Sequence, residues 1–186
     1  MKRFFDFLLA LIGTLFIFIP SLIIALLIKI TSKGPILFWS KRIGENNKIF
    51  FMPKFRTMKE NTPDVATHLL KDPERFLTLI GPFLRRSSLD EIPQLYSVLL
   101  GAMSLVGPRP ALFNQDDLIS LRSKRGIHKI KPGITGWAQI NGRDEITIPE
   151  KVSLEEEYLD KMSWKMDMHI LWLTFVKVLK KESITH

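Results

Sequence analysis

The sequence predicts a mainly α-helical protein with a small β-hairpin and an N-terminal membrane segment. Three observations predict this fold class: residues 7–28 form a run of 22 residues without a charged side chain, two β-rich segments follow it around a turn, and helical patterns fill much of the remainder. The chain has 186 residues and a formal net charge of +8. Such a run joined to a basic body excludes both an ordinary soluble domain and a disordered chain. We expect a membrane segment over residues 1–30 and one compact domain over residues 31–186.

The apolar segment is long enough to cross a bilayer. As a helix, 22 residues rise about 33 Å, against a hydrocarbon core of roughly 30 Å, so a single span is one interpretation. Lysine and arginine residues flank both ends, however, and the positive-inside tendency then places both ends in the cytoplasm. Pro20 removes a backbone hydrogen bond, and Ser21 beside it can bond a freed carbonyl. We therefore predict a re-entrant hairpin helix over residues 1–30 that is broken near Pro20 and enters one leaflet.

The body begins with strand-forming residues and continues with helical patterns. Ile36–Trp39 and Ile49–Met52, separated by a polar turn, predict a β-hairpin. Asp72 followed by proline predicts a helix start, and the run Glu155–Glu157 predicts a solvated helix face. Residues 126–149 are rich in glycine and predict a long ordered loop, a kind of segment that is often functional. Further helices are predicted over 62–71, 92–103, 113–125 and 151–161.

The C-terminal segment from Trp164 to Leu179 is apolar on much of its circumference and has lysines near its ends. This pattern fits a core helix and an amphipathic helix in the membrane interface equally well. Both interpretations stay open at this point.

Composition limits the chemistry. The chain has no cysteine, so thiolate chemistry and thiolate zinc sites are excluded. Its 4 histidines lie far apart in the sequence and show no metal-binding spacing. A metal ion, if one is used, is expected to be a hard cation such as Mg²⁺, held by carboxylates and phosphates.

The densest cluster of charged residues is RRSSLDEIPQL, residues 85–95. Ser88 and Glu91 have the spacing of a capping box, which would give the acidic residues a purely structural role. The alternative is phosphoryl transfer: an ionised Asp90 acts as nucleophile or Mg²⁺ ligand, and Glu91 binds the metal or accepts a proton. Arg85 and Arg86 then bind phosphate oxygens and offset the charge of the transition state.

Three more motifs supply groups suited to binding phosphate or a nucleotide. KFRTM follows the hairpin, VGPRP holds one arginine between two prolines, and KPGITGWAQINGR combines glycines, amides, tryptophan and arginine. The candidate substrate-binding residues in these motifs are Lys54, Arg56, Arg109, Gln139, Asn141 and Arg143.

These motifs, in this order after an apolar segment, resemble those of the bacterial sugar transferase family, the monotopic phosphoglycosyl transferases, over essentially the whole chain. The resemblance implies transfer of a sugar 1-phosphate from a UDP-sugar to undecaprenyl phosphate, with release of UMP. It also implies Mg²⁺ and a ping-pong route in which Asp90 forms a covalent phosphosugar intermediate and Glu91 assists. The expected sugar is of the HexNAc type, such as diacetylbacillosamine, and the reaction would be the first membrane step of glycoconjugate assembly.

The resemblance further implies a helix-rich catalytic domain with interfacial helices at the cytoplasmic face of the bacterial inner membrane. The family breaks its re-entrant helix at a Ser-Pro pair, whereas this chain has the order Pro20-Ser21. The alternative from another class is a non-catalytic, membrane-anchored basic module that binds acidic lipid or nucleic acid. It has no nucleic-acid motif and leaves Asp90 and Glu91 without a role, so we expect no nucleic-acid partner.

Overall fold

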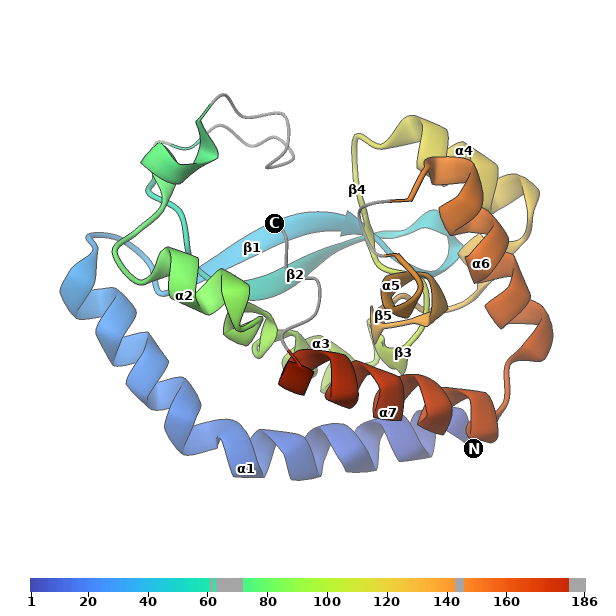
Figure 1. The fold of residues 1–186 in the computed structure, drawn as a ribbon, viewed down its shortest axis with the longest axis horizontal. Helices are drawn as coiled ribbons and strands as arrows, with labels where there is room; N and C mark the ends of the chain where they lie inside the picture. Colours follow the sequence, from blue (N-terminus) through green and yellow to red (C-terminus); the bar gives the residue numbers. More distant parts are fainter. Residues whose placement is uncertain (61, 63–71, 143–145, 181–186) are drawn as a thin grey trace.

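The computed structural model describes residues 1–60, 62, 72–142 and 146–180. Figure 1 shows a small sheet at the centre of the molecule and helices around it. The α-helices are α1 (Lys2–Thr31), α2 (Gly81–Arg86), α3 (Gln94–Leu100), α4 (Asp116–Lys124), α5 (Trp137–Ile140), α6 (Ile148–Lys161) and α7 (Trp164–Lys180). The strands are β1 (Leu37–Ile43), β2 (Ile49–Phe55), β3 (Ser104–Val106), β4 (Ala111–Leu112) and β5 (Gly133–Thr135). Short 3₁₀ helices are η1 (Glu45–Asn47), η3 (Pro73–Phe76), η4 (Leu89–Glu91) and η5 (Ile127–Lys129).

The predicted β-hairpin is confirmed and is longer than expected. β1 and β2 pair in antiparallel fashion from Leu37–Phe55 to Ile43–Ile49, and β4 joins the other edge of β1. The helix start predicted at Asp72 is only the 3₁₀ turn η3, without a capping bond from the Asp72 side chain. The helix predicted over 62–71 lies largely outside the described residues.

The glycine-rich stretch 126–149 is not the continuous loop that we expected. It contains β5, which pairs in parallel with β3, and the short helix α5. A Cβ on Gly133 would lie 2.1 Å from the amide nitrogen of Gly107, and one on Gly136 would lie 2.1 Å from the Gly107 carbonyl oxygen. The glycines therefore permit close backbone packing, and this packing holds the VGPRP segment in place.

α1 is assigned as one helix through Pro20, where we had expected a break. The helix instead changes direction near its middle (Figure 1). The hydroxyl of Ser21 donates to the carbonyl of Ile17 over 2.6 Å, while the carbonyl that loses its donor at Pro20 is that of Phe16. By length and a mean hydropathy of 2.8, α1 is long and apolar enough to cross a membrane.

Both ends of α1 are fastened to the body of the protein. Near the N-terminus, the buried Asp6 accepts hydrogen bonds from the Ser104 hydroxyl and the Leu105 amide, at 2.8 and 3.2 Å. Near the C-terminus, Ile24 and Ile28 pack in one apolar cluster with Phe55 and Leu84. The opposite side of the helix is exposed and apolar over most of its length, including Leu15, Phe16, Phe18, Ile19, Leu22 and Ile23.

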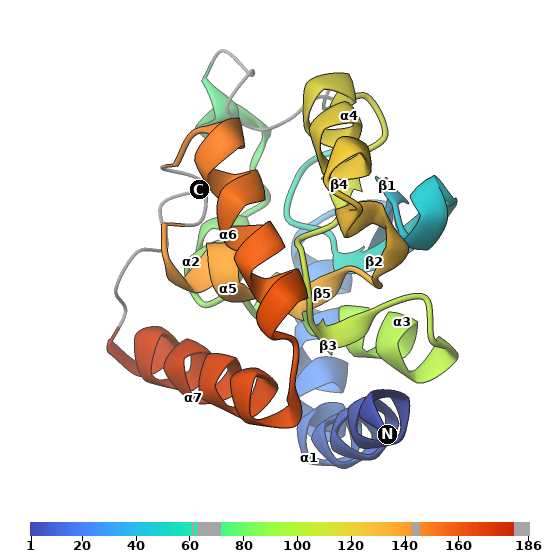
Figure 2. The ribbon, with the colours of Figure 1, turned by 90° about the vertical axis from the view of Figure 1, so that its right-hand side faces the viewer.

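α7 lies beside the N-terminal half of α1 on the same side of the molecule (Figures 1 and 2). The rings of Phe5 and Trp164 are 4.2 Å apart between centroids. Ile170 is fully buried, whereas Trp172 and Phe175 are exposed. One face of α7 therefore belongs to the core, and the other extends the exposed apolar surface of α1.

Candidate active site

The two carboxylates of RRSSLDEIPQL lie on η4, between α2 and α3. The turn at Ser88 has a positive φ of 55°, and the Ser88 side chain makes no capping hydrogen bond. α3 begins at Gln94 with Pro93 as its N-cap residue. The capping box considered from the sequence is therefore not formed, and the structural role that it offered to Glu91 does not apply.

Glu91 is largely buried, with 11% of its side chain exposed, and is paired with two cations from distant motifs. Its Oε1 accepts from Lys54 Nζ at 2.9 Å and from Arg109 Nη2 at 2.8 Å. Burial alone would raise the pKa of Glu91, but Arg109 and Lys54 outweigh it and hold the pKa well below its usual value. Glu91 is therefore charged at neutral pH and holds both cations.

Asp90 is also buried, but it is less completely paired. Its Oδ2 lies 3.9 Å from Lys54 Nζ, and its Oδ1 has no hydrogen-bond partner among the residues described. Burial raises the pKa of Asp90, and the negative charge of the adjacent Glu91 raises it further. The positive charges of Lys54, Arg85 and Arg109 lower it, but the net shift is upward. The structure therefore shifts the pKa values of the two adjacent carboxylates in opposite directions, upward for Asp90 and downward for Glu91.

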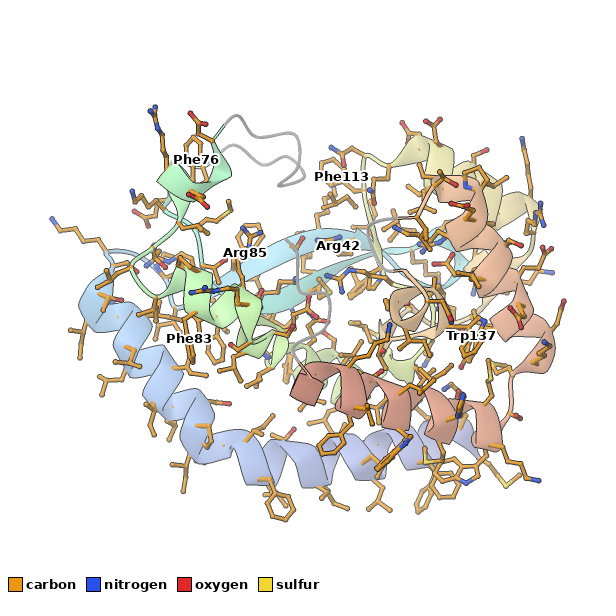
Figure 3. The ribbon with its side chains drawn as sticks, viewed as in Figure 1. Arg42, Phe76, Phe83, Arg85, Phe113 and Trp137 are labelled. Carbon is orange, nitrogen blue, oxygen red and sulfur yellow. The ribbon has the colours of Figure 1, made fainter. Side chains whose placement is uncertain are left out.

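The two adjacent arginines of α2 take different directions. Arg85 is partly buried, burial lowers its pKa, and its charge interacts with Asp90. Figure 3 shows Arg85 on α2 beside the β1–β2 ribbon. Arg86 is exposed, and its Nε donates to the Pro82 carbonyl at 3.4 Å. The structure thus brings Arg85 to the carboxylates but gives Arg86 a partner within its own helix.

Arg56, a predicted phosphate ligand, is buried at the C-terminus of α1. Its Nη2 donates to the carbonyl and the hydroxyl of Ser32, at 3.2 and 2.8 Å, and its Nη1 donates to the carbonyl of Lys33. The last carbonyls of a helix lack intrahelical partners. Arg56 therefore binds the backbone at the end of α1.

We expect Arg56→Met to lower the stability of the protein without weakening binding of the substrate. Carbonyl groups left without donors at the end of α1 cost about 2–3 kcal/mol, or a fall of about 4–12 °C in melting temperature. Thermal unfolding in detergent and titration of a UDP-sugar measure the two effects. A large rise in the Kd for the UDP-sugar, with unchanged melting, would support the original assignment to phosphate.

The predicted residues of KPGITGWAQINGR that the structure describes lie on α5 or at its C-terminal end. The side-chain amide of Gln139 on α5 is buried, and neither its nitrogen nor its oxygen has a partner among the described residues. Asn141 is exposed and donates to the Trp137 carbonyl at 2.8 Å. Arg143 lies outside the described residues. Trp137, the first residue of α5, lies far from Arg85 in Figure 3.

Two contacts in the structure, made by Arg42 and by Glu155, were not predicted from the sequence. Arg42 Nη1 donates to the Pro110 carbonyl at 3.1 Å, which holds the loop that carries Arg109. Glu155, predicted to be solvated, is 2% exposed and accepts from Arg122 Nε at 2.7 Å. The sequence around Arg42 does not indicate its contact with the Pro110 carbonyl. Glu155 and Arg122 are 33 residues apart, so local patterns do not predict their ion pair.

The described residues contain no group of three or more His, Asp or Glu side chains suited to a metal ion. The pair Asp90 and Glu91 is still compatible with Mg²⁺, because this ion is commonly held by one or two carboxylates together with substrate phosphates. The Oδ1 of Asp90, which has no partner among the described residues, is a hard ligand of the suitable type.

Comparison with known proteins identifies the family. A sequence profile described as "Bacterial sugar transferase" matches residues 1–181. The chain belongs to the bacterial sugar transferase family. It is 41% identical over 188 residues to the uncharacterized sugar transferase EpsL of Bacillus subtilis, covering 99% of this chain and 90% of that protein. It is 33% identical to the exopolysaccharide production protein ExoY of Rhizobium meliloti, covering 95% of this chain and 84% of that protein.

A third relative has a name that states its substrates. The chain is 42% identical to the UDP-glucose:undecaprenyl-phosphate glucose-1-phosphate transferase of Escherichia coli, covering 95% of this chain but only 40% of that protein. The chain therefore spans about two fifths of this longer relative.

Proposed function

We propose that this protein is a membrane-bound phosphoglycosyl transferase that moves a sugar 1-phosphate from a UDP-sugar to undecaprenyl phosphate and releases UMP. One observation carries the proposal: cations from three separate motifs, Lys54, Arg85 and Arg109, converge on the buried Asp90 and the largely buried Glu91. A buried carboxylate surrounded by cations is suited to attack on a doubly charged diphosphate. The name of the Escherichia coli relative supports the choice of both substrates.

In the first half-reaction, a carboxylate oxygen of Asp90 attacks the phosphorus that bears the sugar. A bond forms between this oxygen and phosphorus while the bond from phosphorus to the bridging oxygen of the diphosphate breaks. UMP leaves with the bridging oxygen, and the sugar phosphate stays on Asp90 as an acyl phosphate. Lys54 and Arg85 offset the charge that develops.

In the second half-reaction, a phosphate oxygen of undecaprenyl phosphate attacks the same phosphorus. The bond to Asp90 breaks, its carboxylate is restored, and the product is a polyprenyl diphosphate sugar. Glu91 is a poor general base because its pKa is held low by Arg109 and Lys54. We therefore assign Glu91 to fixing these two cations and contributing to the metal site.

Mg²⁺ belongs to the same proposal, with Asp90 and Glu91 as its protein ligands and the substrate diphosphate as the third source of oxygens. When bound, the ion supplies positive charge to the diphosphate oxygens and aligns them. The protein's own cations remain necessary, because they are in place on the carboxylates before any substrate arrives.

Release of UMP tests the function and the donor together. Purified protein, polyprenyl phosphate and Mg²⁺ are mixed with UDP-glucose, UDP-galactose or UDP-HexNAc donors that include UDP-diacetylbacillosamine. We expect one donor to give release that a chelator abolishes. The HexNAc expectation from the family resemblance competes here with the glucose in the name of the Escherichia coli relative. No release with any donor would contradict the proposal and favour a non-catalytic basic module.

The proposal includes a re-entrant arrangement of α1 at the cytoplasmic face of the inner membrane. A helix that spans a bilayer has its two ends on opposite sides, whereas both ends of α1 contact one body. The exposed apolar side of α1 and the exposed aromatic residues of α7 can enter the same leaflet. Leu89 and Ile92, which flank the carboxylate pair, pack against the cluster of Ile24 and Ile28. The proposed reaction thus takes place at headgroup depth.

Single-cysteine labelling tests this topology cleanly, because the native chain has no cysteine. One cysteine is inserted after Met1 and another replaces the exposed Lys33, with the exposed Lys129→Cys as a reference for the body. We expect an impermeant maleimide to label all three from the same side of oriented vesicles. Phe16→Cys, on the exposed apolar side of α1, should stay unlabelled. Labelling of the first two positions from opposite sides would establish a span.

A further inference from the structure

Gln94 is a buried polar residue that the proposed reaction does not use. It is 1% exposed, and its side-chain nitrogen Nε2 has no hydrogen-bond partner among the described residues. A buried amide donor without a partner destabilises a fold, so such groups are rare unless they serve a purpose. Gln94 is the first residue of α3 and follows the carboxylate pair directly.

Asp90 and Gln94 are joined by a tight turn. Ile92 and Pro93 both have helical dihedral angles, with φ and ψ of −49° and −44° for Ile92 and −61° and −15° for Pro93. The backbone bonds here span three residues, from the Ile92 amide to the Leu89 carbonyl and from the Leu95 amide to the Ile92 carbonyl. Four residues of such a turn rise only about 8 Å, which is short enough for the Gln94 amide and the Asp90 carboxylate to meet.

The two groups are chemically complementary. Asp90 Oδ1 is a buried acceptor without a partner among the described residues, and Gln94 Nε2 is a buried donor in the same condition. The other oxygen, Oδ2, lies on the side of Lys54. A donor held on Oδ1 would fix the rotation of the carboxylate and leave Oδ2 directed toward the cations that bind the substrate.

We propose that Gln94 is a positioning residue for the nucleophile. In the reacting state its Nε2 donates to Asp90 Oδ1, and this orients Oδ2 for attack on phosphorus. The gap between the two groups closes when substrate binds, as is common for catalytic hydrogen bonds in free enzymes. Gln94 exchanges no proton or electron pair, and the bonds made and broken are those of the first half-reaction. This inference rests on the proposed function.

Gln94→Met is the most informative variant, because it keeps the length of the side chain and removes both polar atoms. We expect the rate of UMP release in a single turnover to fall about 10- to 100-fold, as for loss of one hydrogen bond to a charged group. The KM for the UDP-sugar should change less than about twofold, because only orientation is lost. The melting temperature should stay the same or rise, since an unpaired buried amide is replaced by an apolar group.

Val98→Ala is the matched control on the same helix. Val98 is fully buried in the apolar core, so its truncation should lower the melting temperature while the single-turnover rate of the folded protein is kept. A Gln94→Met protein with the wild-type rate would overturn the proposal. A lower melting temperature with a loss of rate that tracks the loss of folded protein would also overturn it, because Gln94 would then have a structural role.

The outcomes separate this inference from the proposed function. If the wild-type protein releases no UMP from any donor, the function fails, while the melting of Gln94→Met still reports whether the amide is unpaired. If the wild-type protein is active and only the rate of Gln94→Met is unaffected, the role of Gln94 fails and the function stands.

Discussion

Asp90→Asn should abolish sugar phosphate transfer, with the rate of UMP release falling about 10⁴-fold or more. An amide oxygen is a far weaker nucleophile than a carboxylate, and removal of a nucleophile typically costs this much. The loss should be in the rate and not in binding, because Lys54, Arg85 and Arg109 remain to bind the diphosphate. UMP release under single-turnover conditions measures the effect. Activity near the wild-type level would exclude Asp90 as the nucleophile.

The same variant should not unfold, and this distinguishes chemistry from structure. The pKa of Asp90 is raised in the folded protein, chiefly by burial, so its ionised form opposes folding above the unfolded pKa of about 3.9. A neutral Asn removes this penalty. At pH 7 and in the presence of a chelator, the melting temperature of Asp90→Asn should equal or exceed that of the wild type. The difference should disappear below about pH 3.9. A strongly destabilised Asp90→Asn protein would contradict this account of the site.

Glu91→Gln should reduce both activity and stability. Glu91 Oε1 holds Lys54 and Arg109 at 2.9 and 2.8 Å, so loss of its charge leaves two cations near the site without their common partner. Removing one member of a buried ion pair costs about 3 kcal/mol. Misplacement of the phosphate-binding cations should lower the rate about 100-fold. Loss of stability with full activity of the folded protein would make Glu91 a structural residue only.

The effect on stability should depend on pH in a defined direction. The pKa of Glu91 is depressed in the folded protein by Arg109 and Lys54. Its contribution to stability is therefore complete above the unfolded pKa of about 4.3 and is lost as the pH falls through the folded value. The difference in melting temperature between the wild type and Glu91→Gln should be largest at neutral pH and shrink in acid. Asp90→Asn is the matched control, because its effect on stability has the opposite sign.

Local sequence patterns predicted the parts of the site that neighbouring residues determine. Asp90 and Glu91 were found because they are adjacent, acidic and placed beside arginines, and Lys54 and Arg109 because short motifs contain them. The hairpin followed from strand-forming residues on both sides of a polar turn, and β1 and β2 do pair across that turn. The order of the motifs along the chain carried the family resemblance, which no single motif would have supported.

The directions of side chains and the contacts between residues distant in the sequence could not be predicted from local patterns. Arg85 and Arg86 are neighbours, yet successive residues of a helix point about 100° apart, so only Arg85 interacts with Asp90. Arg56 binds the end of α1 because β2 ends there, and Glu155 is buried because Arg122 reaches it from another helix. The parallel pair of β3 and β5 was missed because three-residue strands are too short to show alternation.

The covalent intermediate on Asp90 is the central claim, and intact mass measurement tests it most directly. The purified protein is incubated with its UDP-sugar and Mg²⁺ in the absence of undecaprenyl phosphate. We expect a mass increase of one sugar phosphate on the peptide that contains Asp90, together with one equivalent of UMP. Addition of undecaprenyl phosphate should remove the adduct, and Asp90→Asn should never form it. UMP release that requires the lipid acceptor, without any adduct on the protein, would contradict the account.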